Sequence, residues 1–259
     1  MAIAVMDDAQ SSHAEDVAPV AGPLTPVSGV LSLAEILSAV HEGRLRSPLM
    51  ARGFVWSRTH VLALWKSLYA GWFIGEFLTR AEEVGRLLSP ITTPLATDGE
   101  ADAVPATAGV TGLYDGLNRL GCLSMTAFAR SIWRRDSEAS VSWRVAFDPF
   151  DGTFHRPTRQ LLTQQPHILP DISLLFRASD GGEVDAVVCS HLMRMRNAGT
   201  RIGVPVDGNE LARAEIALRR LRAVLNRYPV SVVAMPAGAS DQEALKQMFY
   251  ANGVYDWHR

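Results

Sequence analysis

Signals for helices and signals for strands alternate along the whole chain, and this alternation limits the folds that are open to it. Ser32 and Glu35 have the spacing of a capping box, and the apolar residues that follow recur with the period of a helix. A long amphipathic helix is expected over 209–227. Directly after it, the run from Pro229 to Met235 is rich in β-branched residues, as buried strands are. The sequence therefore predicts a mixed domain of the α/β or α+β class.

The other expected elements continue this alternation. Gly43 and Gly71 each follow a helical pattern, and a glycine at that position favours the end of a helix. The remaining predictions are a helix over 58–69, a strand over 73–79, a helix over 118–133, a strand over 141–147, a helix over 184–197, and a last helix that opens at Ser240 and ends near Asn252.

Composition divides the chain into a leader and one domain. Residues 1–29 are rich in Ala, Pro, Ser and Asp without periodicity, so we expect a disordered leader. Residues 30–259 then form a single domain, and a chain of 259 residues with 47% hydrophobic residues can bury a sizeable core. Within this domain, the Pro-, Thr- and Ala-rich segment 86–109 is expected to be a surface loop.

The cysteines and the apolar runs favour a cytoplasmic protein. Cys122 and Cys189 each lie in a segment that reads as buried structure, which argues against disulfides and for a reducing compartment. No run reaches the eighteen or so apolar residues that cross a bilayer, so we expect no membrane role.

The net charge of -2 gives the chain no general attraction to nucleic acid, so any such binding must come from local patches. Of the 25 basic residues only Lys66 and Lys246 are lysine, and guanidinium groups can contact phosphate oxygens bidentately. The alternative is a bias in the base composition of the coding DNA.

The segment from Tyr114 to Leu120 is the most informative for chemistry. A strand that ends in Asp-Gly and runs into a helix places free backbone N–H groups and the positive end of the helix dipole at one spot, which attracts phosphate. Gly116 allows close approach, Arg119 can bind phosphate oxygens, and Asp115 can hold Mg²⁺ or orient a water. The alternative is an ordinary Asp-Gly turn with a solvated arginine.

A second informative segment covers residues 48–57. Arg52 lies between apolar residues in a short extended stretch, where an unpaired buried charge is costly. It therefore faces either an acid or an anionic ligand. Trp56 precedes Ser57, which has the character of a helix N-cap, and anchors the loop in the core or stacks on a base.

Four stretches, taken in order, resemble the N-terminal domain of GmrSD-type restriction endonucleases, whose fold is similar to that of ParB and sulfiredoxin. Segment 47–56 is similar to the family's I-P-x-F-Q-R-x-Y-V-W-like segment, and 64–75 to its L-x-x-S-L-x-x-G helix and following strand. The core motif D-G-Q-Q-R-L falls on 115–120, and the E-x-F-x-x-I-N-x-x-G element on 243–253. The resemblance covers about residues 30–255 and implies an α+β fold, a mixed sheet with surrounding helices.

The resemblance implies a domain that binds a nucleoside triphosphate, with or without Mg²⁺, in defence against foreign DNA. Such a domain couples the state of the nucleotide to DNA cleavage by an attached or partner HNH nuclease. By position, the resemblance gives Asp115 and Arg119 the catalytic roles and Asp115 the metal. The nucleotide-binding set that it implies is Arg52, Asp115, Gly116, Asn118, Arg119 and Asn252.

Three positions depart from the family pattern. The glutamines of the core motif are Leu117 and Asn118, and the glutamine of F-Q-R is Ala51, so three amides that could position a water or a base are lost or shortened. Binding of phosphate by backbone and arginine can survive these changes while turnover fails. Whether the chain is an NTP hydrolase is therefore left open by the sequence.

The histidines do not form an HNH site. His155, His167, His191 and His258 lie at spacings that do not suit metal ligands, so each reads as a structural or surface residue. Family members usually continue beyond the element at 243–253 into a nuclease domain, so we expect either a standalone short member or a truncation.

The alternative function is a catalytically silent module of the same fold that binds DNA or a partner protein. It is motivated by the arginines of the helix over 209–227, which alternatively form a solvated face that Glu210 and Glu215 offset. A homo-oligomer is compatible with either function. The arginines in question are Arg213, Arg219, Arg220, Arg222 and Arg227.

Overall fold

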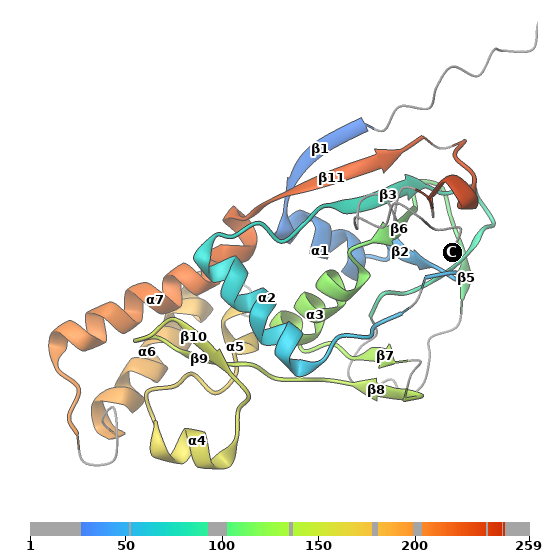
Figure 1. Cartoon of the computed structure of the whole chain (residues 1–259). Helices are drawn as coiled ribbons and strands as arrows, with labels where there is room; N and C mark the ends of the chain where they lie inside the picture. The colour runs from blue at the N-terminus through green and yellow to red at the C-terminus, as the bar shows by residue number, and fades with distance from the viewer. Residues whose placement is uncertain are drawn as a thin grey trace, which may run out of the picture.

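A computed structural model describes residues 27–51, 53–92, 103–134, 137–177, 181–198, 204–236, 238–244 and 246. Its central feature is a seven-stranded sheet with the order β1-β11-β3-β6-β2-β4-β5 (Figure 1). The strands are β1 (Val27–Ser32), β2 (Leu45–Pro48), β3 (Phe77–Ala81), β4 (Leu87–Ser89), β5 (Val104–Pro105), β6 (Thr111–Asp115) and β11 (Pro229–Met235).

The sheet is mixed. β11 pairs with β3 in parallel and β2 pairs with β6 in parallel, whereas the other neighbouring pairs are antiparallel. The ladder between β3 and β6 contains a bulge between Leu78 and Thr79, close to the end of β6 that leads to Asp115. A mixed sheet with accompanying helices confirms the α+β class that was expected from the sequence.

The helices and the small hairpins cover one face of the sheet and extend the molecule away from it. Figure 1 shows the sheet at one end, α4, α6 and α7 towards the other end, and α2 and α3 between them. The helices are α1 (Leu33–His41), α2 (Arg58–Ala70), α3 (Leu117–Phe128), α4 (Arg159–Gln164), α5 (Ser173–Phe176), α6 (Gly181–Ala198) and α7 (Gly208–Arg227), and the hairpins pair β7 (Ile132–Arg134) with β8 (Ala139–Val141) and β9 (Ala146–Asp148) with β10 (Thr153–His155).

The main core lies between the sheet and helices α1, α2 and α3. Phe77 and Leu113 of the sheet are fully buried there, as are Trp65 of α2 and Leu120 of α3. The Trp65 indole N–H donates to the hydroxyl of Thr126 on α3 at 2.8 Å, so the polar atom that this large side chain buries is satisfied. The two helices whose termini flank the candidate site are thereby fixed against each other.

The opposite face of the sheet carries a cluster of charged side chains. Arg80 is only 3% exposed and donates to the carbonyl of Ala239 at 2.6 Å. It also pairs with Glu82 at 3.1 Å and with Asp241 at 2.9 Å. The hydroxyl of Tyr114 donates to Glu82 at 2.7 Å, and burial raises the pKa of Tyr114. These bonds fasten the segment around Ala239 to the sheet.

The capped helices are confirmed almost to the residue. Ser32 and Glu35 form the expected capping box, and Gly71 ends α2 in a left-handed conformation. Helices α6 and α7 and strand β11 also agree with the predictions. Ser240 and Glu243 form the expected box before the last helical turn, whereas the end near Asn252 lies outside the described residues.

Several boundaries were wrong. β1 begins at Val27, inside the expected leader, because it pairs with β11 from the far end of the chain; residues 1–26 lie outside the described part. The expected loop 86–109 contains β4 and β5, which extend the edge of the sheet, and 93–102 lie outside the described part. α3 ends at Phe128, not 133, because Ala129 turns left-handed and the chain enters β7.

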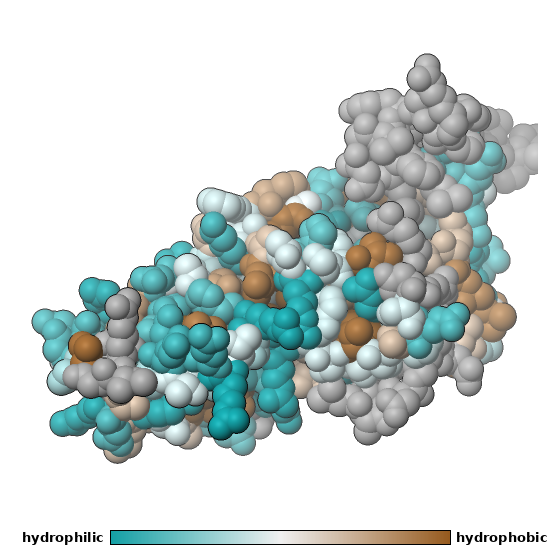
Figure 2. Space-filling view, turned by 60° about the horizontal axis from the view of Figure 1, so that its bottom comes forward, coloured by the Kyte–Doolittle hydropathy of each residue, from teal (hydrophilic) through white to brown (hydrophobic). Residues whose placement is uncertain are grey.

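Two further expectations change in the structure. β3 begins at Phe77 instead of residue 73, and the strand expected over 141–147 is split between β8 and β9. Cys122 is buried as expected but Cys189 is exposed on α6, and both are free thiols. Among the described residues, no helix combines the length and the apolar character needed to cross a bilayer. Figure 2 shows a largely hydrophilic surface over the end that holds α4, α6 and α7.

Candidate functional site

A hollow of about 690 Å³ opens at the start of α3, where the sequence placed the site. Two stretches of the chain that are far apart in the sequence form its wall. One runs from the segment before α2 along α2 to the residues that follow it, and the other is the turn from β6 into α3. The lining residues are Ala51, Gly53, Trp56, His60, Ala63, Leu64, Ser67, Phe73, Ile74, Gly75, Glu76, Tyr114, Asp115, Gly116, Leu117, Asn118 and Arg119. We call this space the α3 hollow.

Gly116 makes the turn from β6 into α3. Its φ of +99° lies in the left-handed region, and a Cβ there would lie 2.2 Å from the ring of Phe77, so only glycine fits. As the cap residue of α3, Gly116 provides no side-chain hydrogen bond to the first turn. The first-turn N–H groups of α3 and the positive end of its dipole therefore lie beside the hollow without a side-chain cap.

The side chain of Asp115 stabilises the same turn through two hydrogen bonds. Its Oδ1 accepts the N–H of Gly116 at 2.7 Å, and its Oδ2 accepts from Arg119 Nη2 at 3.1 Å. The side chain is 27% exposed, so solvent reaches part of the carboxylate. Asp115 is thus oriented by the fold and accessible from the hollow, as a metal ligand must be.

Arg119 is buried and donates to the chain's own backbone. Its side chain is 12% exposed, and its Nη1 and Nη2 donate to the carbonyls of Ile74 at 2.7 Å and Glu76 at 2.6 Å. The guanidinium lies 4.7 Å from the ring centroid of Phe77, and burial lowers the pKa of Arg119. Gly75 has a φ of +94°, which favours glycine, and a Cβ there would also lie 2.3 Å from Nη1. Arg119 therefore fastens segment 74–76 to α3, and its role as a phosphate ligand stays a prediction.

Asn118 has a similar positioning role. Its Oδ1 accepts backbone N–H bonds from Val55 at 2.8 Å and Trp56 at 3.3 Å. These bonds fix the wall of the hollow that precedes α2, where Trp56 also stacks on His60 at 5.8 Å. The shortened amide at this position thus holds the chain itself, and its role as a nucleotide ligand stays a prediction.

Two of the expected site residues cannot be placed. Arg52 and Asn252 lie outside the described residues. Ala51 and Gly53, on either side of Arg52 in the sequence, both line the α3 hollow. The anion-binding role of Arg52 therefore stays a prediction, while Arg119, the other arginine of the expected nucleotide-binding set, lies at the wall of the hollow.

The charged lining suits a cation bound together with an anion. Asp115 brings a partly exposed carboxylate to the hollow and pairs with Arg119, and Glu76 lies at its wall. Within the described ranges, no group of three or more His, Cys, Asp or Glu side chains is arranged to hold a metal ion. Mg²⁺ is usually bound through one or two carboxylates plus substrate phosphates, and this donor set fits that pattern.

Sequence reasoning missed the contribution of segment 72–76. We expected most of it to be strand, whereas its carbonyls accept from Arg119 and its side chains line the hollow. The signal in the sequence was the pair Gly71 and Gly75, one directly before the segment and one within it, because glycines weaken a strand. In the structure both have positive φ, which a regular strand does not allow.

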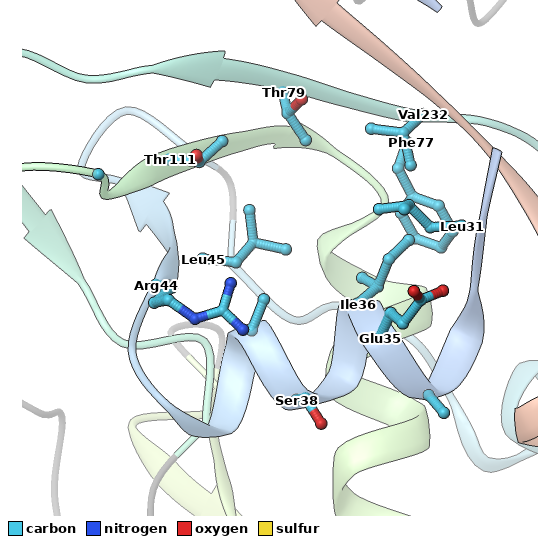
Figure 3. Close-up of a pocket in the computed structure, with 13 residues that line it drawn as sticks. Leu31, Glu35, Ile36, Ser38, Arg44, Leu45, Phe77, Thr79, Thr111 and Val232 are labelled. Carbon is cyan, nitrogen blue, oxygen red and sulfur yellow. The ribbon is translucent and has the colours of Figure 1, made fainter. Parts of the chain in front are cut away.

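A second hollow of about 610 Å³ lies between α1 and the sheet (Figure 3). Ile36 and Leu45 point into it, and Thr79 and Thr111 contribute from the strands above. Its two charged residues are occupied, because Glu35 is bonded to the Ser32 cap and Arg44 pairs with Glu42 at 2.6 Å. The α3 hollow, with an accessible carboxylate and an uncapped helix start, is therefore the better candidate site.

No protein-family model matches this chain, and no curated protein matches it either.

Proposed function

We propose that this chain is the nucleotide-binding domain of a DNA-targeting restriction or phage-defence system, similar to the N-terminal domain of GmrSD-type enzymes. One observation carries the proposal. Segments 51–56, 64–75 and 115–119 belong to three separate stretches of the resemblance, and all three line the α3 hollow. The first two segments are neighbours in the chain, whereas 115–119 lies far from them in the sequence, and a shared binding site gives a reason for the remote motif to meet the other two at one cavity.

In the proposed complex, the phosphates of a nucleoside triphosphate lie at the start of α3. The first-turn N–H groups and the helix dipole attract them. Asp115 would hold Mg²⁺, which bridges phosphate oxygens when bound. Arg119 and Asn118 act as positioning residues, because their polar atoms fix the walls that the nucleotide contacts.

Hydrolysis of a bound triphosphate requires an oriented water. Leu117 and Ala51 stand where the family has glutamine, and neither side chain can hydrogen-bond a water. The Oδ1 of Asn118 already accepts two backbone N–H groups. We therefore expect tight binding with slow hydrolysis, so that the domain reports the nucleotide state to a nuclease domain or partner that cleaves DNA. The finer features, a ParB/sulfiredoxin-like fold, a cytoplasmic location and a homo-oligomer, are part of the same proposal.

Thermal unfolding of the full chain tests the proposal. Each of ATP, GTP, CTP and UTP is added with and without MgCl2, and at least one is expected to raise Tm by on the order of 5 °C at saturation. Asp115→Asn should remove the part of the shift that depends on magnesium. Glu42→Gln, which removes an exposed carboxylate away from both the α3 hollow and α7, serves as the matched control and should leave the shift unchanged. The proposal fails if none of the four triphosphates changes Tm beyond scatter with or without magnesium.

A second candidate is a catalytically silent module that binds DNA or a protein partner. It is favoured by the contacts of Asn118 and Arg119, because the polar atoms expected to serve a nucleotide bind the chain's own backbone. A chain that binds DNA but shows no response to any triphosphate would support this second candidate over the first.

A further inference from the structure

A concave surface runs along α7, on the side that faces the end of α2. It consists of a hollow of about 750 Å³ and a smaller one of about 280 Å³, and both are lined by Tyr69 and Arg220. We call the combined surface the α7 groove. Its floor is the side of α7 from Arg213 to Arg227, and its walls are the end of α2 with Phe73 and the turn 149–152. None of the sequence motifs that led to the α3 hollow predicts this groove.

Three arginines of α7 lie along the groove at every seventh position. Arg213, Arg220 and Arg227 are all exposed. Seven residues make almost two full turns, so the three side chains share one face of the helix and follow each other at intervals of roughly 10 Å. The groove therefore presents a straight row of guanidinium groups about 20 Å long.

The arginines of this row are not neutralised. In the part of the chain that the structure describes, Arg213 and Arg227 form no ion pair or side-chain hydrogen bond. Arg220 donates to the carbonyl of Tyr69 at 2.8 Å and lies 4.6 Å from the ring centroid of Tyr69, and neither partner is a carboxylate that would neutralise it. One carboxylate, that of Asp151, lines the smaller hollow. Three positive charges against one negative charge favour an anionic partner.

The acidic residues of α7 are occupied elsewhere. Glu210 accepts the backbone N–H of Asp207 at 3.0 Å as part of the helix cap. Glu215 accepts from Arg219 at 2.8 Å, and Arg219 also pairs with Asp185 of α6 at 2.6 Å. These pairs neutralise Arg219, which lies beside the row, and leave the row itself charged.

Exposed aromatic rings accompany the arginines. Phe73 lines the larger hollow with 76% of its surface exposed, and its neighbour Trp72 is 58% exposed. The hydroxyl of Tyr228 donates to the carbonyl of Trp72, which fixes this aromatic segment at the edge of the groove. Exposed rings beside guanidinium groups are the pattern that proteins use to stack unpaired bases while they neutralise the backbone.

We propose that the α7 groove binds single-stranded nucleic acid. Arg213, Arg220 and Arg227 contact phosphates in succession, and Phe73 stacks on a base. A duplex satisfies the arginines equally well but hides the faces of its bases within the stack, so the exposed ring favours a single strand. An acidic peptide offers negative charge but no planar bases for Phe73. The α7 groove thus gives the chain a second binding surface, which shares Phe73 with the wall of the α3 hollow.

Fluorescence anisotropy of labelled oligo(dT) with the full chain tests the proposal. Three phosphate contacts predict that log K falls against log salt with a slope of about -2. The variant Arg213→Gln/Arg227→Gln should weaken binding by about tenfold or more and reduce the slope to about -0.7. It should fold normally, because neither side chain has a partner in the described structure. Arg159→Gln/Arg196→Gln removes two exposed arginines from α4 and α6 and is the matched control, expected to bind within about twofold of the parent.

The aromatic contact is tested separately. Phe73→Ala should weaken oligo(dT) binding about tenfold, because unpaired bases stack on the ring. The same variant should leave the binding of a duplex of equal length unchanged, because paired bases are not free to stack on it. Phe73 also lines the α3 hollow, so Asp115→Asn is included and should leave oligo(dT) binding unchanged.

Each of four results would overturn the proposal. The first is binding of oligo(dT) that does not depend on salt, and the second is the same affinity for Arg213→Gln/Arg227→Gln as for its control. The third is duplex binding as tight as single-strand binding, with no effect of Phe73→Ala. The fourth is displacement of labelled oligo(dT) by polyglutamate at a charge concentration at which unlabelled oligo(dT) does not displace it. The last result would assign the groove to an acidic protein partner.

Discussion

At the α3 hollow, one arginine is buried and donates to carbonyls of the chain itself, whereas along the α7 groove three arginines are exposed and two of them have no partner in the described structure. The residue type is the same and its surroundings differ. Arg119 has lost most of its water and must bond to Ile74, Glu76 and Asp115 in exchange. Arg213 and Arg227 keep their water and can exchange it for a ligand.

Whether an arginine is buried or exposed thus decides whether it stabilises the fold or is free to bind a ligand. A charge that is buried among carbonyls contributes to the fold, because removing it leaves acceptors without donors. An exposed and unpaired arginine contributes little to the fold and can serve a partner. We therefore expect substitutions at the α3 hollow to lower the free energy of unfolding first, and substitutions along the α7 groove to change binding alone.

The largest effect is expected from Gly116→Ala. The new Cβ would meet the ring of Phe77 at 2.2 Å in a backbone conformation with φ of +99°. Strain and overpacking together should lower the free energy of unfolding by about 4 kcal/mol, which urea unfolding followed by circular dichroism would measure. Gly71→Ala is the matched control, because Gly71 has φ of +77° but nothing within 4 Å of a Cβ. The control should cost about 1 kcal/mol, and equal losses in both variants would show that the contact with Phe77 is not tight.

Arg119→Gln tests the comparison directly. The variant leaves the carbonyls of Ile74 and Glu76 without their donor and Asp115 without its cation, so the free energy of unfolding should fall by about 3 kcal/mol. Arg227→Gln makes the same chemical change in the α7 groove and should stay within about 0.5 kcal/mol of the parent. Both are measured by urea unfolding. A similar loss at both positions would remove the distinction between the two hollows.

The sequence was informative where structure is decided locally. α1 and α7 carry capping boxes and a clear helical period, and β11 is a β-branched run, so each could be predicted from its own residues. β1 could not, because it forms only by pairing with β11 from the far end of the chain. β5 could not, because it has two residues and pairs only with the three-residue strand β4. Strand pairing of this kind depends on the finished sheet, and no local pattern reports it.

The same limit applies to the candidate site. The turn at Asp115 and Gly116 could be predicted, because a strand that ends in Asp-Gly before a helix is a local pattern. The partners of Arg119 lie 43 and 45 residues away, so its buried position could not be predicted. On α7 the arginine face was visible, but which arginines are free depends on Asp185, which lies 34 residues from Arg219.

Asn118→Ala is expected to have an intermediate effect. It removes the acceptor of two backbone N–H groups in segment 55–56, so the free energy of unfolding should fall by about 2 kcal/mol. Asn118→Asp keeps an oxygen at this position and adds a negative charge in the first turn of α3, which the helix dipole favours, so it should recover most of the loss. Equal destabilisation of both variants, again by urea unfolding, would mean that the oxygen of Asn118 is not what holds the segment.

The smallest effect should come from freeing Arg219. Asp185→Asn/Glu215→Gln removes both of its ion-pair partners, so a fourth unpaired guanidinium joins the α7 groove. Oligo(dT) affinity at low salt should rise by about twofold to threefold, and the salt slope should steepen by about 0.7. Glu42→Gln is the control, because it frees Arg44 in the same way at a distant surface. The control removes one carboxylate instead of two, so a proportionate rise in its affinity would mean that net charge alone attracts the strand. A rise confined to the groove variant would show that pairing decides which arginines of α7 can bind, as burial does for Arg119.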